Sequence, residues 1–320
     1  MLNLNLVYPE QSDINYKISK FPDGQQDVTI LRNDKYDDKD PYIRLSGYDL
    51  EVFNGNVVKI LSRFNSFKDL ELIVASTKTL RRLGVKTIHL YIPYLLGARS
   101  DRQFVEGGTS YLVDVVAPIL NAQNFESVTV IDVHSDVAAA CINNLKMIDN
   151  TDLVKYVFDY MTEKNNGSWV QPLVVSPDAG SLKKIYNVTK KVGIHTEVIV
   201  CSKYRDTDGN LSKTHVPLSV NDVDKDLVII DDICDGGRTF INIVESVKSL
   251  RSLSSSVHPS QYGKIYLIVT HGIFSAGFEL LSQNFDGVFC TNSVKDFDGG
   301  EWVTKNGEHY FFPITQMNVF

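Results

Sequence analysis

Acidic side chains and glycines follow one apolar stretch of the chain, in an order that suits anion binding. Residues 227–230 are leucine, valine and isoleucine, which is typical of a strand buried on both faces of a parallel sheet. The acids and glycines that come next are Asp231, Asp232, Asp235, Gly236 and Gly237. A glycine turn from a strand into a helix directs backbone N–H groups at one point, and the helix dipole favours an anion there. This stretch predicts a phosphate site, with two carboxylates placed to accept hydrogen bonds from pentose hydroxyls.

Residues 231–239 resemble the ribose 5-phosphate or PRPP loop of phosphoribosyltransferases and of ribose-phosphate diphosphokinases. The alternative is an ordinary strand-turn-helix corner with solvated acids, which would not require three acids and two glycines at these spacings. The family loop usually carries a small residue where this chain has Arg238. A guanidinium there would add bidentate anion binding, and it could serve a ribose whose 5′ position carries more than one phosphate.

Strand and helix patterns alternate on both sides of this stretch, which predicts an α/β fold with open, mainly parallel sheets flanked by helices. Strands are expected over 2–8, 87–91, 127–131, 173–176 and 264–269, and helices over 66–83, 110–121, 181–192 and 275–285. A loop is expected over 33–40, a further strand over 41–45, and a turn at 206–209 that could belong to a mobile flap. The domain boundary is placed near residue 150, which gives domains 1–150 and 151–320.

The composition excludes several classes of protein. The chain has 320 residues, of which 43% are hydrophobic and 22% charged, as in soluble globular proteins of two ordinary domains. No apolar run approaches the roughly 20 residues that span a bilayer, and the first residues do not form a leader, so a cytoplasmic protein without a membrane partner is expected. The net charge of −7 argues against a general nucleic-acid binder. The cysteines have no CxxC spacing and predict neither zinc nor disulfides; they are Cys141, Cys201, Cys234 and Cys290.

Six further motifs each have an ordinary interpretation when taken alone. A phenylalanine-proline-aspartate-glycine sequence is also a turn signal, arginines after a strand also form surface ion pairs, and a histidine at a strand end is more often structural than a ligand. The acids beside His134 favour a hard-cation site. In chain order the motifs are FPDG at 21–24, PYLLGARSDR at 93–102, DVHSD at 132–136, SPDAG at 176–180, SKYR at 202–205 and THGIFS at 270–275. With residues 231–239, this order resembles that of ribose-phosphate diphosphokinases, also called PRPP synthetases.

The resemblance implies two phosphoribosyltransferase-like domains, the use of ATP and Mg²⁺, and a homo-oligomer, dimeric or dimer-based, whose neighbouring subunits complete the nucleotide site. It places ATP at Phe21, Asp23, Gln25, Arg99, Ser100, Asp101 and Arg102, the first three facing the adenine of a neighbour. It assigns catalysis to Lys203, Arg205, Arg99 and His134, and the Mg²⁺ bound to ATP to His134 and Asp178. The residues implied for the sugar phosphate are Asp178, Asp231, Asp232, Asp235, Gly236, Gly237, Arg238 and Thr239. The chain departs from the family at Gln25, usually Glu, at Ser100, usually Gln, and over 299–320, where the family's C-terminal helix has no counterpart.

The activity expected from the resemblance is Mg²⁺-dependent transfer of the β,γ-diphosphoryl group of ATP to the anomeric 1-hydroxyl of ribose 5-phosphate, which gives PRPP and AMP for nucleotide biosynthesis. A variant of this activity uses a larger acceptor such as ADP-ribose, which would connect the protein to NAD metabolism. Two other functions stay open. One is a phosphoribosyltransferase that consumes PRPP, and the other is a non-catalytic regulatory homologue.

Overall fold

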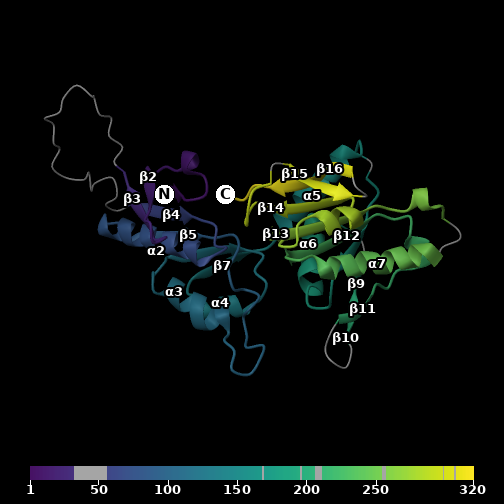
Figure 1. Ribbon diagram of the computed structural model, residues 1–320, viewed down its shortest axis with the longest axis horizontal. Coiled ribbons are helices and arrows are strands. Elements are labelled where there is room, and N and C mark those ends of the chain that lie inside the picture. The colour runs from purple at the N-terminus through teal and green to yellow at the C-terminus, as the bar shows by residue number, and fades with distance from the viewer. Residues whose placement is uncertain are drawn as a thin grey trace. The chain divides into compact units, whose positions relative to one another are not determined.

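The computed structural model describes residues 1–31, 56–167, 169–194, 197–205, 211–253, 257–297, 299–305 and 308–320. The loop expected over 33–40, the strand expected over 41–45 and the turn expected at 206–209 lie outside these residues. The chain splits into two compact units, Met1–Ile148 with Phe320, and Asp149–Val319. Each unit has its own open sheet with helices (Figure 1), so the α/β class predicted from the sequence is confirmed.

The first unit contains a parallel sheet of five strands in the order β1-β4-β5-β6-β7. Alternate residues such as Ile60, Leu90 and Val130 are fully buried in one core, as expected where side chains alternate along a strand. The expected strand over 2–8 is shorter in the structure, and β7 was not predicted. The strands are β1 (Leu2–Asn5), β4 (Val57–Leu61), β5 (Thr87–Tyr91), β6 (Ser127–Ile131) and β7 (Leu145–Ile148).

The longest helix of this unit is α2 (Phe67–Arg82). Ser66 and Asp69 form the capping box that their spacing predicts, and Gly84 follows the helix with φ of 89°. The helix expected over 110–121 is a π-helical turn (Leu112–Val116) followed by α3 (Ala117–Asn121). Pro118 has no N–H to donate one turn back, which accounts for the irregular segment before it. A short helix, α4 (Val137–Cys141), follows β6.

A separate antiparallel hairpin in the first unit joins β2 (Tyr16–Lys20) to β3 (Gln26–Ile30). Residues 21–25 form its turn, as predicted. The Gly24 N–H donates to the Phe21 carbonyl at 2.9 Å, and Gly24 has φ of 92°. The left-handed conformation at this position favours glycine, so the turn and the register of the hairpin follow from the sequence.

The second unit contains a sheet of seven strands in the order β15-β16-β14-β13-β12-β8-β9, with parallel pairing except between β15 and β16. A two-stranded hairpin, β10 with β11, stands apart from this sheet. The strands are β8 (Leu173–Ser176), β9 (Val198–Val200), β10 (Ser202–Arg205), β11 (Leu211–His215), β12 (Leu227–Cys234), β13 (Ile265–Gly272), β14 (Gly287–Thr291), β15 (Gly300–Lys305) and β16 (Glu308–Met317).

Both faces of this sheet are covered, which explains the continuous apolar run at its centre. Leu227 and Ile229 pack in a core with side chains of α7 (Arg238–Leu253), whereas Val228 and Ile230 pack in a second core with side chains of α5 (Thr151–Lys164) and α6 (Leu182–Val192). Two cores on one strand are the expected result of period-two alternation between two helical layers. The last helix, α8 (Glu279–Asn284), is shorter than the expected 275–285, because Gly277 in the turn before it has φ of 71°.

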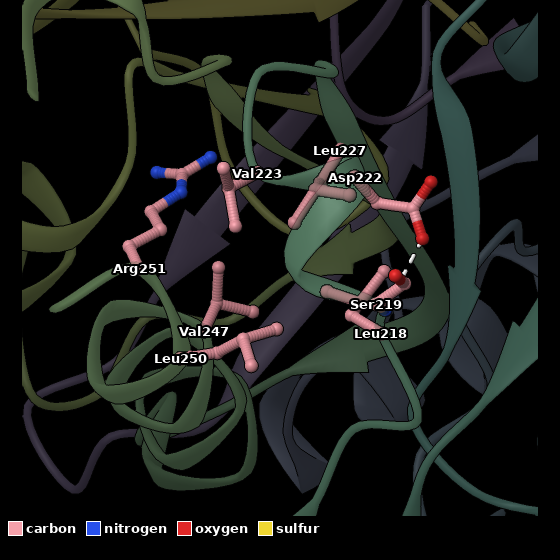
Figure 2. Close-up of a pocket in the computed structure, with 8 residues that line it drawn as sticks. All are labelled: Leu218, Ser219, Asp222, Val223, Leu227, Val247, Leu250 and Arg251. Carbon is pink, nitrogen blue, oxygen red and sulfur yellow. Dashed lines mark hydrogen bonds between the residues drawn. The ribbon is translucent and has the colours of Figure 1, made fainter. Parts of the chain in front are cut away.

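A narrow apolar pocket with no room for a water molecule lies near the start of β12, beside Leu227, Val247 and Arg251 (Figure 2). The Ser219 N–H donates to Asp222 Oδ2 at 3.1 Å beside it, in the capping box of the 3₁₀ turn Val220–Asp222. The acids of β12 lie at the opposite end of the strand, so this cavity is a packing feature rather than part of the predicted site. No helix within the described residues is long and apolar enough to cross a membrane.

Candidate active site

The predicted phosphate site is a strand-to-helix corner of the second unit. β12 ends at Cys234 and α7 begins at Arg238, so residues 235–237 form the corner. The Gly237 carbonyl accepts hydrogen bonds from the N–H groups of Phe240 at 3.0 Å and Ile241 at 3.1 Å, which starts the helix. The Cys234 carbonyl accepts from the N–H of Ile273 at 2.9 Å, which ties the corner to the end of β13. The corner therefore has a fixed backbone at the N-terminus of a 16-residue helix.

Glycine is required at one position of this corner. Gly237 has φ of 75°, and a Cβ atom there would lie 3.2 Å from Leu281 Cδ2. Gly236 has no such restriction, since a Cβ atom built on it meets nothing within 4 Å. The two glycines thus differ in purpose: Gly237 sets the turn, and Gly236 leaves open space beside it.

The acids Asp231 and Asp232 belong to β12 itself, whereas the sequence predicted that the strand ends before them. β12 pairs with β13 through Cys234, but it pairs with β8 only through Ile229. The start of α6 lies beside the acids where β8 has ended: Asp231 Oδ1 accepts from Ser181 Oγ at 3.2 Å, and Asp232 Oδ2 lies 3.5 Å from Lys184 Nζ. Strand β12 thus places both carboxylates beside the start of α6.

Asp178 completes a cluster of carboxylates with this pair. Its Oδ1 accepts from the Ser181 N–H at 3.1 Å and lies 3.4 Å from Ser181 Oγ, so the Ser181 hydroxyl stands between Asp178 and Asp231. The pKa of Asp231 is raised to about 7, mainly by burial and also by the negative charges of Asp232 and Asp178, while hydrogen bonds from the Asp232 N–H and Ser181 act in the opposite direction. Lys184 offsets part of the negative charge of the cluster, and a bound cation or several hydroxyl donors would stabilise it further.

The donor set suits magnesium held jointly with a phosphorylated ligand. Within the part of the chain that the structure describes, no three His, Cys, Asp or Glu side chains gather as a metal site. Magnesium needs only one or two carboxylates when phosphate oxygens and waters fill its other positions. Asp178 and Asp231 can supply those carboxylates. His134 lies in the first unit, so its predicted role in binding the same ion stays a prediction.

The remaining predicted residues of the corner lie as follows. Asp235 Oδ1 accepts a hydrogen bond from Ser275 Oγ, which fixes that carboxylate against the loop after β13. Arg238 is exposed at the first position of α7, and Thr239 is half-buried next to it. The structure therefore brings together the acids and glycines assigned to the sugar phosphate, and it leaves the guanidinium of Arg238 on the solvent side.

Lys203 and Arg205 belong to β10 of the small hairpin, where Lys203 pairs with Thr214 and Tyr204 with Lys213. The register shifts between Tyr204 and Arg205. The hairpin protrudes from the unit in Figure 1, in keeping with the predicted flap. The side chains of Lys203 and Arg205 lie outside what the structure describes, so their contacts with a substrate stay a prediction.

The nucleotide residues predicted in the first unit occupy loops at one edge of its sheet. Arg99, Ser100, Asp101 and Arg102 follow β5, and His134 follows the neighbouring strand β6. The Ser100 N–H donates to the Gly97 carbonyl at 2.8 Å, and the Ser100 carbonyl accepts from the Leu112 N–H at 3.0 Å. Carboxyl ends of parallel strands are where open α/β sheets bind ligands, so the position agrees with the prediction, which the structure does not test further.

The turn of the β2–β3 hairpin carries the other predicted nucleotide residues. Phe21 is 47% exposed, and Asp23 and Gln25 are also exposed. The Gln25 N–H donates to Asp23 Oδ1 at 3.1 Å, which holds the turn. An exposed phenylalanine on a rigid turn is available to a ligand or another subunit, and the predicted adenine contact stays a prediction.

Comparisons with known proteins agree with this geometry. A family model described as "Phosphoribosyl transferase domain" matches residues 145–258. The ribose-phosphate pyrophosphokinases of Haemophilus ducreyi and Thermococcus kodakarensis are 24% and 25% identical to this chain over 91% and 88% of its length, and the matches cover 82% and 86% of those proteins. The chain is thus similar to ribose-phosphate pyrophosphokinases over most of its length.

The fold agrees with that of a solved structure. A phosphoribosylpyrophosphate synthetase from Mycobacterium smegmatis superposes with a TM-score of 0.69 at 16% sequence identity, covering 97% of this chain and 88% of that one. The fold class predicted from the sequence, two phosphoribosyltransferase-like domains, is thereby confirmed.

Sequence reasoning missed three residues of the candidate site. Ser181 and Lys184 contact Asp231 and Asp232, and Ser275 contacts Asp235. A signal was present for two of them. Ser181 directly follows the predicted SPDAG motif, and Lys184 lies three residues further along the helix, on the same face.

Proposed function

We propose that the protein transfers the β,γ-diphosphoryl group of ATP to the 1-hydroxyl of ribose 5-phosphate, which gives PRPP and AMP, with Mg²⁺ as the metal. The observation that carries this proposal is the corner at 231–239, where three carboxylates and a glycine turn stand at the start of α7. Sequence similarity supports it, since the similar proteins are named ribose-phosphate pyrophosphokinases. The predicted cytoplasmic location stays a prediction.

The corner holds the acceptor. The 5′-phosphate binds at the N-terminus of α7, where backbone N–H groups at the turn and the helix dipole stabilise negative charge. Asp231 and Asp232 accept hydrogen bonds from the ribose hydroxyls, because their carboxylates stand beside the same helix start, α6. This arrangement leaves the anomeric 1-hydroxyl directed away from the phosphate, toward the incoming nucleotide.

The transfer forms one bond and breaks another. The 1-hydroxyl oxygen attacks the β-phosphorus, the bond from that phosphorus to the oxygen bridging it to the α-phosphorus breaks, AMP leaves with the electron pair, and the hydroxyl proton passes to solvent. Such a step depends on in-line positioning and on dispersal of charge more than on a strong base. Asp178 and Asp231 would hold a magnesium ion, which would supply positive charge against the diphosphoryl group. Lys203, Arg205 and Arg99 disperse the rest.

The decisive experiment incubates the purified protein with ATP, Mg²⁺ and ribose 5-phosphate and measures AMP and PRPP. Equal amounts of the two products are expected. The Lys203→Ala variant is expected to lower kcat about 10-fold or more, on the scale of one lost transition-state contact. Lys213→Ala, on the facing strand β11, is the matched control and should keep near-normal turnover. Absence of AMP would exclude a diphosphokinase, and normal turnover of Lys203→Ala would remove Lys203 from the mechanism.

A larger acceptor is the second candidate, and Arg238 favours it. The guanidinium is exposed at the first position of α7, beside the end of the site that receives the 5′-phosphate. It is therefore available to a second phosphate at the 5′ position, as in ADP-ribose. Comparing kcat/KM for ribose 5-phosphate and ADP-ribose decides between them. Release of AMP from ATP with either sugar would also separate both candidates from a phosphoribosyltransferase and from a non-catalytic homologue.

A further inference from the structure

A second cavity of the second unit lies beside α6, has a volume of about 250 Å³, and is lined by side chains that carry polar or charged ends on largely apolar stems. Four of its lining residues are spaced along one face of the helix at positions 184, 187, 188 and 191. The lining residues are Asp149, Lys184, Asn187, Val188, Lys190 and Lys191. The cavity is large enough for a small anion together with water.

The lining carries an excess of positive charge. Three lysines face one carboxylate, Asp149, which forms an ion pair with Lys191. Lys190 forms no ion pair with any residue that the structure describes. Asn187 adds an amide that can donate hydrogen bonds. Three ammonium groups, two of which also contact a carboxylate, and an amide donor suit an oxyanion such as a phosphate group.

One of these lysines also belongs to the acceptor corner. Lys184 Nζ lies 3.5 Å from Asp232 Oδ2, and the side chain of Lys184 is 33% exposed whereas that of Asp232 is 8% exposed. The contact is long for a hydrogen bond, and an anion in the cavity would give the ammonium an alternative partner. The buried carboxylate of Asp232 would then lose its neighbouring cation.

We propose that this cavity binds a phosphate-class anion, and that the anion weakens acceptor binding because it draws Lys184 from Asp232. The coupling rests on the function proposed above, whereas the binding itself does not. An anion in the cavity and an anionic sugar phosphate in the corner compete for the same cation. Coupling between two sites typically changes affinity about 5- to 150-fold, so a several-fold rise in the acceptor KM is expected, with little change in kcat.

Lysine acylation tests the binding without any need for activity. The full-length protein is treated with an acylating reagent alone, or with inorganic phosphate, pyrophosphate or AMP present, and the acylation rate of each lysine is measured by mass spectrometry. Lys183 is the internal reference, because it is exposed on the same helix and does not line the cavity. The expected result is slower acylation of Lys190 and Lys191 at an unchanged rate for Lys183. Equal changes at Lys183 and Lys190, or no change, would overturn the anion site.

The same three probes distinguish the source of the phosphate group. Protection by inorganic phosphate or pyrophosphate at a lower concentration than AMP identifies an inorganic anion. Protection by AMP at the lowest concentration identifies a nucleotide. Either result supports the site, because the lysines recognise the phosphate group itself.

Kinetics with matched variants test the coupling. The anion that protects Lys190 is expected to raise the acceptor KM of the wild type and of Lys183→Ala several-fold, and to have a much smaller effect on Lys190→Ala. The two variants remove the same charge from exposed positions of one helix, so they control for each other. An equal rise in KM for all three proteins would place the anion in the acceptor corner and overturn the coupling. Failure of the proposed function would instead appear as no AMP from any of them, with lysine protection still measurable.

Discussion

Asp231 is the acid of the corner whose carboxyl accepts hydrogen bonds from both the Ser181 hydroxyl and the Asp232 N–H. Its carboxyl is partly buried with two further carboxylates near it, and its pKa is raised to about 7. Ionisation of a carboxyl in this environment lowers the stability of the folded protein. Such losses of stability are common at sites whose residues are arranged to bind a ligand.

Asp231→Asn is expected to stabilise the metal-free protein at neutral and alkaline pH. The usual pKa of the carboxyl is 3.8, so its ionisation opposes folding increasingly as the pH rises from about 4 to about 7, and fully above that. The melting temperature of the variant should exceed that of the wild type by several degrees at pH 8, which corresponds to a gain of about 1 kcal/mol or more in unfolding free energy. The increase should be smaller at pH 5. Melting curves in EDTA at both pH values measure this. An equal rise in melting temperature at pH 5 and pH 8 would contradict this prediction. An equal effect of Asp224→Asn, at an exposed position, would also contradict it.

Gly237→Ala is expected to lower stability by about 1–2 kcal/mol, whereas Gly236→Ala should change it by much less. An alanine at position 237 must adopt φ near 75° and would place its Cβ 3.2 Å from Leu281, whereas position 236 is open. Urea unfolding of the two variants gives the comparison. Equal losses for both would show that the left-handed conformation of Gly237 is not required.

At the scale of elements, β16 closes one side of the second sheet and was not predicted. The tail 299–320 reads as turns and aromatic residues, yet Phe312 and Ile314 are buried in the core while Phe311 is 42% exposed. Strand alternation across this short aromatic segment explains the difference. Its parallel partner β14 lies before the tail, and Val288 pairs with Ile314, so the pattern of the tail alone did not indicate its place in the sheet.

Phe312→Ala is therefore expected to cost about 3–5 kcal/mol of unfolding free energy, because it leaves a cavity beside Phe278, whose ring centroid lies 6.3 Å away. Phe311→Ala, one residue earlier on the opposite face, should cost less than about 1 kcal/mol. Denaturant unfolding of both variants checks this pair. Similar losses for the two would contradict the register of β16.

Sequence reasoning recovered the elements whose signals are local. The strands at 87–91, 127–131 and 173–176 and the capping box of α2 appear as predicted, because apolar alternation and caps depend on neighbouring residues. The end of β12 was placed too early, since carboxylates seldom continue a buried strand and the pairing with β13 decides the outcome. The contacts of Ser181 and Lys184 with the acids could not be predicted, because they join residues about fifty positions apart.

At the scale of the whole molecule, the predicted activity needs residues from both units and from a neighbouring subunit. The exposed hairpin turn with Phe21 is the element that the family resemblance assigns to the neighbour's adenine, whereas Lys203 stays in its own site. Mixing two inactive proteins can test such a division.

Phe21→Ala and Lys203→Ala are each expected to have low activity alone and to regain part of it when mixed under conditions that allow subunits to exchange. A mixed oligomer contains one site with both residues intact. AMP production before and after exchange measures the recovery. No recovery in a sample shown by native mass spectrometry to contain mixed oligomers would mean that each subunit works with its own hairpin.

The different burial of the cysteines allows opening of the corner to be measured by thiol labelling. None of the four is in a disulfide, Cys141 is partly exposed, and Cys234, at the last position of β12, has no exposed surface. A thiol reagent should therefore label Cys141 quickly. Labelling of Cys234 should be slower, because it requires local opening of the end of β12. The difference between the two labelling rates would report how often the acceptor corner opens. A bound sugar phosphate should slow the labelling of Cys234 further.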